Sequence, residues 1–358
     1  MYCHGILKEK FWLEKKKLEE RELNLFFHFP SYRFCKVMKK NFKIFIAGHK
    51  GMVGRSVVKF LTNKKFGKLI LKTKKELNLE DYKKVDNFLY NEKPEVIINC
   101  AGKVGGILAN SQFPTEFLNE NLSIQTNLIN LAYKHNIDNL INLGSSCIYP
   151  KNSKQPIKEK YLLTSILEET NEAYALAKIV GLKLCEYYNK QFQTSYITLM
   201  PCNLYGPHDN FDAKNSHFIP ALIRKILNEK IKNFPKIELW GTGKAKREII
   251  HGDDLASAIY FILKKKINND KKLNKIIKKS SLINVGTGYE LSIKKFAEII
   301  IKIENSKLNL VYNKNYPDGM LRKVLNNKIM SVLGWKASIS TKEGLKETIK
   351  WYKNNHLR

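Results

Sequence analysis

The segment Lys43-Ile44-Phe45-Ile46-Ala47-Gly48-His49-Lys50-Gly51-Met52-Val53-Gly54 decides the fold of this 358-residue chain. Its apolar first part predicts a strand over 43–47, and the stretch after it predicts a helix over 51–61. Glycines in this position allow a tight turn and let the backbone approach a pyrophosphate, which the helix N-terminus attracts. A chance glycine cluster in a turn is the alternative, but the strand before it and the helix after it favour a dinucleotide loop. We predict that this loop is formed by Gly48, His49, Lys50, Gly51, Met52, Val53 and Gly54.

Strand and helix patterns continue to alternate after this segment. Strands are predicted at 43–47, 68–72, 95–100, 139–143, 195–200 and 282–285. Helices are predicted at 51–61, 82–90, 121–134 and 172–190. This alternation is typical of an α/β fold with a doubly wound parallel sheet of the Rossmann type.

The length of the chain predicts about two domains. We assign residues 42–205 to the dinucleotide-binding domain, with a later segment, about 248–288, returning to it. Residues 206–358 are predicted to form mainly a smaller C-terminal α/β lobe for substrate, and 1–41 an N-terminal extension of unknown role. The lysine- and asparagine-rich stretch 264–281 is predicted to be a surface insertion.

The net charge of +30 would normally suggest a nucleic acid or an anionic membrane as partner. All but seven of the 63 basic residues are lysine, however, whereas recognition of phosphate and bases favours arginine. The lysines are scattered along the chain and accompany many asparagines. We therefore predict solvated lysine-rich faces, with no nucleic-acid partner and no membrane partner.

The six cysteines are irregularly spaced and contain no Cys-x-x-Cys pair. This spacing predicts neither a disulfide framework nor a zinc site, so no metal is expected and a reducing, cytoplasmic location fits. The chain contains no run of 18 apolar residues, and we expect a soluble protein.

The end of the second predicted strand indicates which dinucleotide is bound. An NAD-preferring fold places an acid there for the ribose 2′-hydroxyl, but this chain has Leu71-Lys72-Thr73-Lys74-Lys75. The cations suit a 2′-phosphate, so we predict NADP(H), with Lys74 as its partner and Lys50 assisting. The alternative is that these are ordinary lysines of a lysine-rich chain.

Tyr174 and Lys178 are spaced i, i+4 on a predicted helix, so both project from one face. The chain has three such pairs, as chance predicts, but only this one follows a strand end that bears a serine, Ser145. In that setting the Lys178 charge is expected to lower the pKa of Tyr174, and Ser145 to hold a carbonyl oxygen against the phenol. The set predicts a phenol that protonates an oxygen as hydride arrives.

Further stretches narrow the interpretation: AGKVGGI at 101–107, GSSCIYP at 144–150, NLYGPHDNF at 203–211 and NSH at 215–217. With the glycine loop and the Tyr-x-x-x-Lys helix, they make the chain from about residue 43 onward similar to the extended short-chain dehydrogenase/reductases. Within that family it resembles the GDP-L-fucose synthases, which are bifunctional 3,5-epimerases and 4-reductases.

This resemblance implies a substrate, GDP-4-keto-6-deoxy-D-mannose, that is epimerised at C3 and C5 and reduced at C4 by NADPH. Family members use a cysteine and a histidine to exchange the protons, and these fall on Cys147 and His217. Without the resemblance, Cys147 would be interpreted as a small core residue and His217 as a polar loop residue. Ser145 and Tyr174 would stabilise the enolate, and Tyr174 would then serve the reduction.

The resemblance also implies the rest of the site and a homodimer. The further cofactor residues would be Leu143, Gly144, Ser146, Lys178, Pro201, Asn203, Leu204 and His217. The GDP portion would be held by Lys225, Trp240, Arg247 and Asp318, although Trp240 can equally be a core residue and Asp318 a turn residue. The dimer would form through helices such as 121–134 and the one bearing Tyr174. The family often has arginine where this chain has Lys50, Lys74 and Lys225; lysine keeps the charge but loses the bidentate geometry.

Two other functions stay open at this point. One is a related sugar-nucleotide epimerase or reductase that retains bound NAD; the missing acid after the second strand and the Cys147/His217 pair count against it. The other is a catalytically silent, basic protein that binds nucleotide or nucleic acid. It would have to explain the complete set of Ser145, Tyr174 and Lys178.

Overall fold

The computed structural model describes residues 42–213, 215–231, 236–315 and 320–357. The N-terminal extension predicted for 1–41 lies outside these residues. No helix in the described ranges combines the length and the apolar character needed to cross a membrane.

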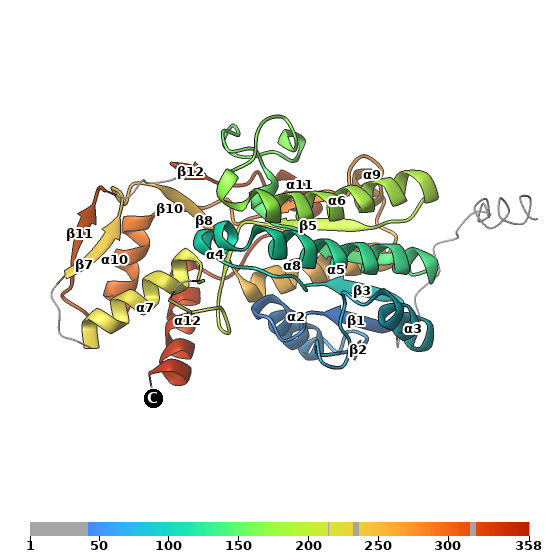
Figure 1. The fold of residues 1–358 in the computed structure, drawn as a ribbon, viewed down its shortest axis with the longest axis horizontal. Helices are drawn as coiled ribbons and strands as arrows, with labels where there is room; N and C mark the ends of the chain where they lie inside the picture. Colours follow the sequence, from blue (N-terminus) through green and yellow to red (C-terminus); the bar gives the residue numbers. More distant parts are fainter. Residues whose placement is uncertain (1–41, 214, 232–235, 316–319, 358) are drawn as a thin grey trace, which may run out of the picture. The chain divides into compact units, whose positions relative to one another are not determined.

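A six-stranded parallel sheet forms the centre of the fold, as predicted (Figure 1). Its strands are β1 (Lys43–Ala47), β2 (Lys68–Ile70), β3 (Val96–Asn99), β4 (Asn139–Leu143), β5 (Ile197–Pro201) and β9 (Leu282–Val285). They lie in the order β2-β1-β3-β4-β5-β9, and every neighbouring pair is parallel. This order, which reverses direction between β1 and β3, is that of a doubly wound sheet. The α/β Rossmann-type prediction is confirmed.

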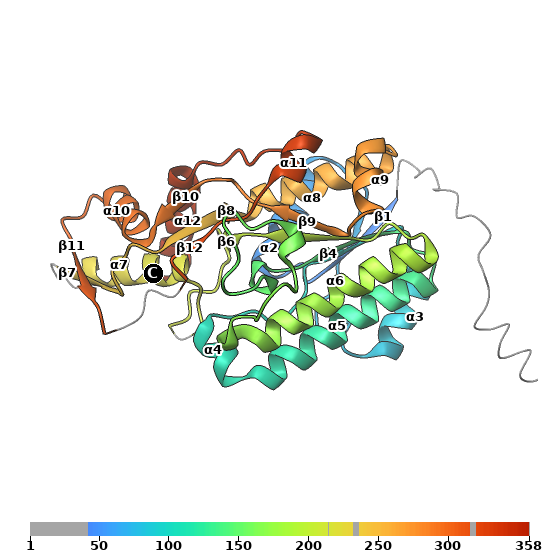
Figure 2. The ribbon, with the colours of Figure 1, turned by 90° about the horizontal axis from the view of Figure 1, so that it is seen from above.

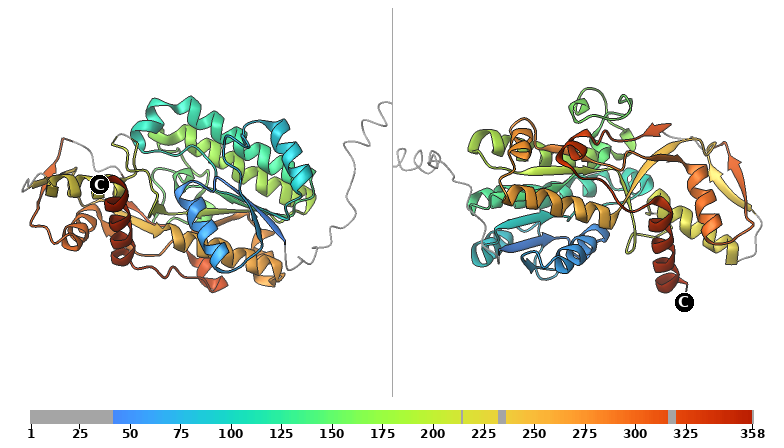
Figure 3. Two further views of the ribbon diagram at one scale, coloured as in Figure 1. Left: turned by 90° about the horizontal axis from the view of Figure 1, so that it is seen from below. Right: turned by 180° about the vertical axis from the view of Figure 1, so that it is seen from behind.

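Helices cover both faces of this sheet because its strands are apolar on both sides (Figure 2). One layer holds α2 (Met52–Asn63) and α8 (Gly252–Ile267); the other holds α3 (Tyr82–Glu92), α5 (Pro114–Lys134) and α6 (Glu172–Phe192). In β1, Ile44 and Ile46 belong to the core cluster that includes α2 and α8, whereas Phe45 belongs to the one with α3 and α5. The right panel of Figure 3 shows α8 packed along α2.

The C-terminal part forms a second lobe around its own core. Strand β8 (Lys246–His251) pairs with β10 (Glu290–Ser292), β12 (Arg322–Lys323) and β6 (Asn203–Tyr205), while β7 (Lys236–Trp240) pairs with β11 (Asn309–Asn313). The helices of this core are α7 (Phe218–Ile231), α10 (Ile293–Ile303) and α12 (Thr341–His356). Shorter helices are α4 (Ile107–Gln112) and α11 (Lys328–Leu333).

The lysine-rich stretch 264–281 differs from its prediction as a surface insertion. It contains the end of α8 and a further helix, α9 (Lys271–Ile277). Leu273 and Ile277 of α9 are buried in the main core, and the buried Lys266 ammonium donates hydrogen bonds to the carbonyls of Ser195 and Asp138. The lysine content concealed an amphipathic helix whose apolar residues are spaced i, i+4.

The turn between β1 and α2 has the close packing that the glycines predicted. Gly48 adopts a φ of +76°, and a Cβ atom there would lie 2.6 Å from the backbone nitrogen of Ala101. A Cβ at Gly54 would lie 2.2 Å from the Gly48 carbonyl oxygen. At Gly51, the N-cap of α2, the nearest heavy atom would be 3.5 Å away. Glycine is therefore required for packing at two of the three positions, while a Cβ at the third would make only an ordinary van der Waals contact.

We expect Gly54→Ala to lower the free energy of unfolding by about 2–3 kcal/mol or more, because its methyl group has no room beside the Gly48 carbonyl. The matched change Gly51→Ala should cost less than about 1 kcal/mol, since its methyl group would make only an ordinary contact and the cap preference alone is lost. Urea denaturation followed by circular dichroism measures both. Equal losses for the two variants would contradict this packing account.

Candidate active site

Ser145, Tyr174 and Lys178 come together at the carboxyl end of β4. Ser145 follows β4 directly, and its hydroxyl accepts a hydrogen bond from the Cys147 N–H at 3.5 Å. Tyr174 and Lys178 lie one turn apart on α6, with the Lys178 Nζ 5.7 Å from the centroid of the Tyr174 ring. The Tyr174 phenol is also hydrogen-bonded to Ser145. The structure thus brings together the three residues that the sequence predicted as a catalytic set.

The pKa of Tyr174 moves in the direction opposite to the prediction. Burial raises the pKa of the phenol well above its usual value of 10.0, the neighbouring Cys147 raises it further, and the hydrogen bond with Ser145 lowers it. Burial dominates because the phenolate would lose its hydration. The expectation of a lowered pKa was wrong, and the phenol keeps its proton at neutral pH, as a proton donor must.

Lys178 is buried and anchored to the strand that carries Ser145. Its Nζ donates a hydrogen bond to the carbonyl oxygen of Leu143, the last residue of β4, at 3.1 Å. Burial lowers the pKa of Lys178 to about 8, against the opposing effects of Cys147 and Cys100. The ammonium is therefore mostly charged at neutral pH and titrates just above it.

Cys147 lies in a short 3-10 turn after β4, Ser146–Ile148, and its side chain is buried. Burial raises the pKa of the thiol above 9.0, while Lys323, Ser145 and Lys178 lower it. The thiol is therefore protonated at neutral pH. Its pKa depends on residues from three separate parts of the chain.

His217 directly precedes α7 and is exposed, in contrast to Cys147. The loop before it is fixed by a hydrogen bond from the Gly106 N–H to the Asn215 carbonyl oxygen at 3.0 Å. The surrounding protein and the charge of Lys323 lower the pKa of His217 below 6.5. The imidazole is consequently neutral at neutral pH. Since Lys323 acts on both Cys147 and His217, it lies close to both of them.

Lys323 is a site residue that the sequence analysis missed. It lies on β12, directly opposite Arg247 of β8. The next two residues are held in place: the Val324 carbonyl accepts from the Ile157 N–H at 2.8 Å, and the Leu325 N–H donates to Glu248 at 2.7 Å. Burial lowers the pKa of Lys323, Cys147 raises it and Arg247 lowers it further. A lysine on a two-residue strand carries no recognisable sequence signal in a lysine-rich chain.

The predicted 2′-phosphate region contains an acid that the sequence analysis did not consider. Lys74 is exposed and paired with Glu80 at 2.8 Å and with Glu120 at 3.8 Å. Glu76 accepts a hydrogen bond from the Thr73 N–H at 2.8 Å, and hydrogen bonds with Thr73 lower its pKa, with smaller contributions from Lys72 and Lys50. Lys50 and Lys72 therefore converge on this loop, whereas Lys74 already has acidic partners.

The other predicted cofactor residues follow the ends of the same strands. Pro201 is the last residue of β5, and Asn203 and Leu204 are half-buried on β6. Gly144, after β4, packs so closely on Met200 that a Cβ there would lie 2.3 Å from the methionine methyl carbon. Ser146 is buried beside it. His49 is half-buried in the glycine loop.

Three of the predicted GDP-binding residues lie on the C-terminal lobe. Lys225 on α7 donates a hydrogen bond to the Glu238 carbonyl oxygen of β7. Trp240, at the end of β7, is 62% exposed, so it is not a core residue. Arg247 donates a hydrogen bond to the Met320 carbonyl oxygen at 2.6 Å. Asp318 lies outside the described residues.

The sequence of this chain matches a known protein family. The sequence profile of the NAD dependent epimerase/dehydratase family matches residues 44–277. The chain belongs to this family.

Relatives within the epimerase/dehydratase family cover nearly the whole described chain. A putative GDP-L-fucose synthase 2 of Arabidopsis thaliana is 43% identical over 89% of this chain and 94% of its own length. The GDP-L-fucose synthase of Escherichia coli strain K12 is 42% identical over 88% of this chain and 98% of its own length. Among solved structures, a GDP-mannoheptose C4 reductase from Campylobacter jejuni with NADP bound is 36% identical, with a TM-score of 0.79 over 88% and 99% of the two chains.

Removing the charge of Lys323 should change the titration of its neighbours in this family member. In Lys323→Met, the pKa of His217 should rise toward 6.5 and that of the Cys147 thiol should rise further, because a nearby cation no longer opposes protonation. NMR titration of isotopically labelled histidine measures the first shift. The matched variant Arg322→Met removes an exposed cation paired with Glu290 and should leave both values unchanged. If the pKa of His217 is unchanged in Lys323→Met, Lys323 does not act on the site.

Proposed function

We propose that this chain is an NADPH-dependent GDP-L-fucose synthase: it epimerises GDP-4-keto-6-deoxy-D-mannose at C3 and C5 and reduces the 4-keto group to give GDP-L-fucose. The observation that carries the proposal is one site that holds both a reductase set, Ser145, Tyr174 and Lys178, and a separate thiol and imidazole, Cys147 and His217. Identities of 42–43% to a GDP-L-fucose synthase and a putative one over most of both chains support the choice of substrate.

The glycine loop and the strand ends fit NADP(H). The exposed backbone at Gly51, where α2 starts, suits a pyrophosphate, and Lys50 and Lys72 suit a 2′-phosphate. Residues 48–54, Lys74, Leu143, Gly144, Ser146, Lys178, Pro201, Asn203, Leu204 and His217 are proposed to hold the dinucleotide. When bound, NADPH supplies the hydride for C4. Lys74 would have to exchange its acidic partners for the phosphate, so Lys50 and Lys72 are the better placed cations.

Reduction of a ketone requires a proton on the oxygen as the carbon receives hydride. The Tyr174 phenol provides it, because burial keeps this group protonated. Ser145, hydrogen-bonded to the same phenol, holds the carbonyl oxygen beside it. Lys178, fixed on the Leu143 carbonyl, keeps a positive charge near the developing oxyanion.

Epimerisation next to a ketone requires one group to remove a proton and another to return it on the opposite face. At neutral pH the site holds a protonated thiol on Cys147 and a neutral imidazole on His217, and therefore one donor and one acceptor. Ser145 and Tyr174 stabilise the enolate between the two transfers. Lys225, Trp240, Arg247 and Asp318 are proposed to bind the GDP portion, with cations for the diphosphate and an exposed indole for the base.

Supplying GDP-4-keto-6-deoxy-D-mannose and NADPH in deuterated water tests both activities at once. NADPH should be oxidised, and NMR of the product should show deuterium at C3 and C5. Cys147→Ser or His217→Gln should lower label incorporation by about 100-fold or more, whereas Tyr174→Phe should lower NADPH oxidation by about 100-fold or more. The larger loss falls on a different step in each case, because Cys147 and His217 act at carbon whereas Tyr174 protonates the 4-oxygen and contributes to epimerisation only by stabilising the enolate.

Matched variants control for damage to the fold. Tyr260→Phe alters the other helical Tyr-x-x-x-Lys pair, on α8, and Cys185→Ser alters a buried free thiol on α6. Both should keep both activities. NADPH oxidation without deuterium in the product would show that the protein is a 4-reductase without epimerase activity. If no reaction occurs, GDP-4-keto-6-deoxy-D-mannose is not the substrate, and the fold assignment still holds.

The pKa of Lys178 predicts how the reductase depends on pH. Because this amine loses its charge as the pH rises through about 8, kcat/KM for NADPH oxidation should fall above that pH. Lys178→Arg should retain some activity and move the alkaline limb to higher pH, since its guanidinium stays charged. Steady-state rates between pH 6 and 10 measure this. An alkaline limb at the same pH in Lys178→Arg would show that another group titrates.

We further propose that the protein is a cytoplasmic homodimer. Helix α6 presents exposed apolar side chains at Leu176, Val180 and Tyr187, which are 41%, 39% and 60% exposed. An apolar stripe of this kind favours a second copy of the same helix as its partner. The four described cysteines are free thiols, which suits a reducing compartment.

A further inference from the structure

A cavity of about 670 Å³ lies beside the glycine loop, between α2, the loop at Pro207 and His208, and α12. It is lined by side chains far apart in the sequence, from Lys50 and Arg55 to Lys350 and Trp351. None of the catalytic side chains described above lines it. Its volume is that of a small-molecule site.

The free charge of this cavity is positive. Lys59 is held by Asp253 at 2.7 Å and lies 3.9 Å from Glu347, so it offsets one of the two acidic charges in the wall. Lys50, Arg55 and Lys350 form no ion pair within the described part of the chain, and all three are exposed. Arg55 and Lys350 therefore face the cavity without an ion-pair partner, and both stay available when Lys50 faces the 2′-phosphate of the cofactor.

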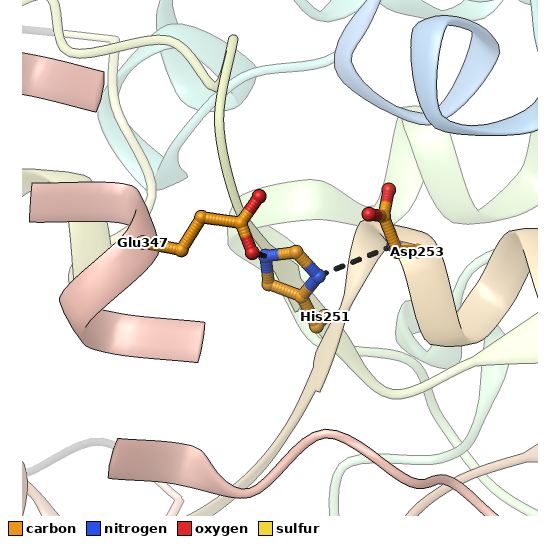
Figure 4. A group of neighbouring side chains, drawn as sticks. All are labelled: His251, Asp253 and Glu347. Carbon is orange, nitrogen blue, oxygen red and sulfur yellow. Dashed lines mark hydrogen bonds and ion pairs between the residues drawn. The ribbon is translucent and has the colours of Figure 1, made fainter. Parts of the chain in front are cut away.

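The acidic side of the cavity is a poor metal site, although His251, Asp253 and Glu347 have ligand atoms within 4.8 Å of one another (Figure 4). The His251 Nδ1 accepts a hydrogen bond from the Asp253 N–H at 3.3 Å, so in the neutral ring the proton lies on Nε2, which faces Glu347 at 3.8 Å. A metal would need that nitrogen deprotonated. The Lys59 ammonium also lies beside both carboxylates, where a metal cation would have to bind.

The pKa of His208 shows that the positive charges act inside the cavity. Partial loss of water contact lowers the pKa of His208, and the charges of Arg55 and Lys59 lower it further. Its backbone φ of +66° is rare for a residue with a side chain and places the ring 4.8 Å from the Trp351 ring. The rings of His208 and Trp351 thus form an aromatic wall in the same cavity as Arg55 and Lys350.

We propose that this cavity is a second anion site, separate from the dinucleotide site, and that it takes a small molecule bearing a phosphate group. Guanidinium and ammonium groups are the side chains that bind phosphate, and Arg55 can do so with two parallel hydrogen bonds. The aromatic wall suits a planar or apolar remainder of the ligand. Because Lys50 also belongs to the glycine loop, an anion here would alter cofactor affinity.

A phosphate in this cavity has two sources: a separate ligand, or the 2′-phosphate of the cofactor reaching past Lys50. We assign a separate ligand because Lys350 and Trp351 belong to α12, away from the strand ends at which this fold binds dinucleotides. The test must therefore be made with the cofactor site filled.

Isothermal titration of the full-length protein, saturated with NADP⁺, with inorganic pyrophosphate as the probe tests the proposal. Binding should be saturable with one site per chain, and Arg55→Gln and Lys350→Gln should each weaken it about tenfold or more. Lys342→Gln removes an exposed lysine from the same helix outside the cavity and should bind as the unaltered protein does. Both tested side chains are exposed, so neither substitution should unfold the protein.

Three results would overturn the proposal. They are the absence of saturable binding, an affinity in Arg55→Gln and Lys350→Gln equal to that of the unaltered protein, and binding that is seen only without NADP⁺. The last would assign the phosphate to the cofactor. None of these measurements uses the sugar-nucleotide substrate, so their outcome is independent of the proposed enzymatic activity.

Discussion

The buried carboxylate of Glu248 connects β8 to the segments that contain Gly288 and Leu325. The position of Lys323 in the active site depends on this connection. Glu248 is fully buried on β8 and accepts hydrogen bonds from the Gly288 N–H at 2.6 Å and the Leu325 N–H at 2.7 Å. Burial raises its pKa, and these donors lower it. A Cβ at Gly286 would lie 2.5 Å from its oxygen, so the connection after β9 must pass directly over it. One side chain thereby aligns β12 with β8 and places Lys323 opposite Arg247.

Local patterns predicted the central sheet because its strands are short apolar runs with buried faces. The bounds 43–47, 139–143 and 282–285 agree with β1, β4 and β9. The start of α5 was predicted at residue 121 but lies at Pro114, because proline suits the first turn of a helix while the apolar periodicity becomes clear only later. Ser145, Tyr174 and Lys178 were predictable for a related reason: strand ends and helix turns determine their spacing.

The parts that the sequence could not predict depend on contacts between distant segments. Lys323 approaches Cys147 and His217 only because β12 pairs with β8, and no periodicity marks a two-residue strand. Glu76 lies beyond the end of β2, but its hydrogen bond with Thr73 returns its carboxylate toward Lys50. The pKa of Tyr174 was predicted in the wrong direction because burial cannot be read from the spacing of a tyrosine and a lysine.

Burial also determines which side chains gain and lose protons in the proposed reactions. In each epimerisation one of Cys147 and His217 takes a proton from carbon and the other gives a different proton to the opposite face, so the total number carried by the pair is unchanged. Reduction differs, because Tyr174 gives its proton to the product and must recover one before the next turnover. Its high pKa makes that recovery favourable, and Lys178, with a pKa of about 8, is the neighbouring group that gains and loses protons near neutral pH. The same burial that retains the proton on the phenol therefore makes the adjacent lysine able to exchange one.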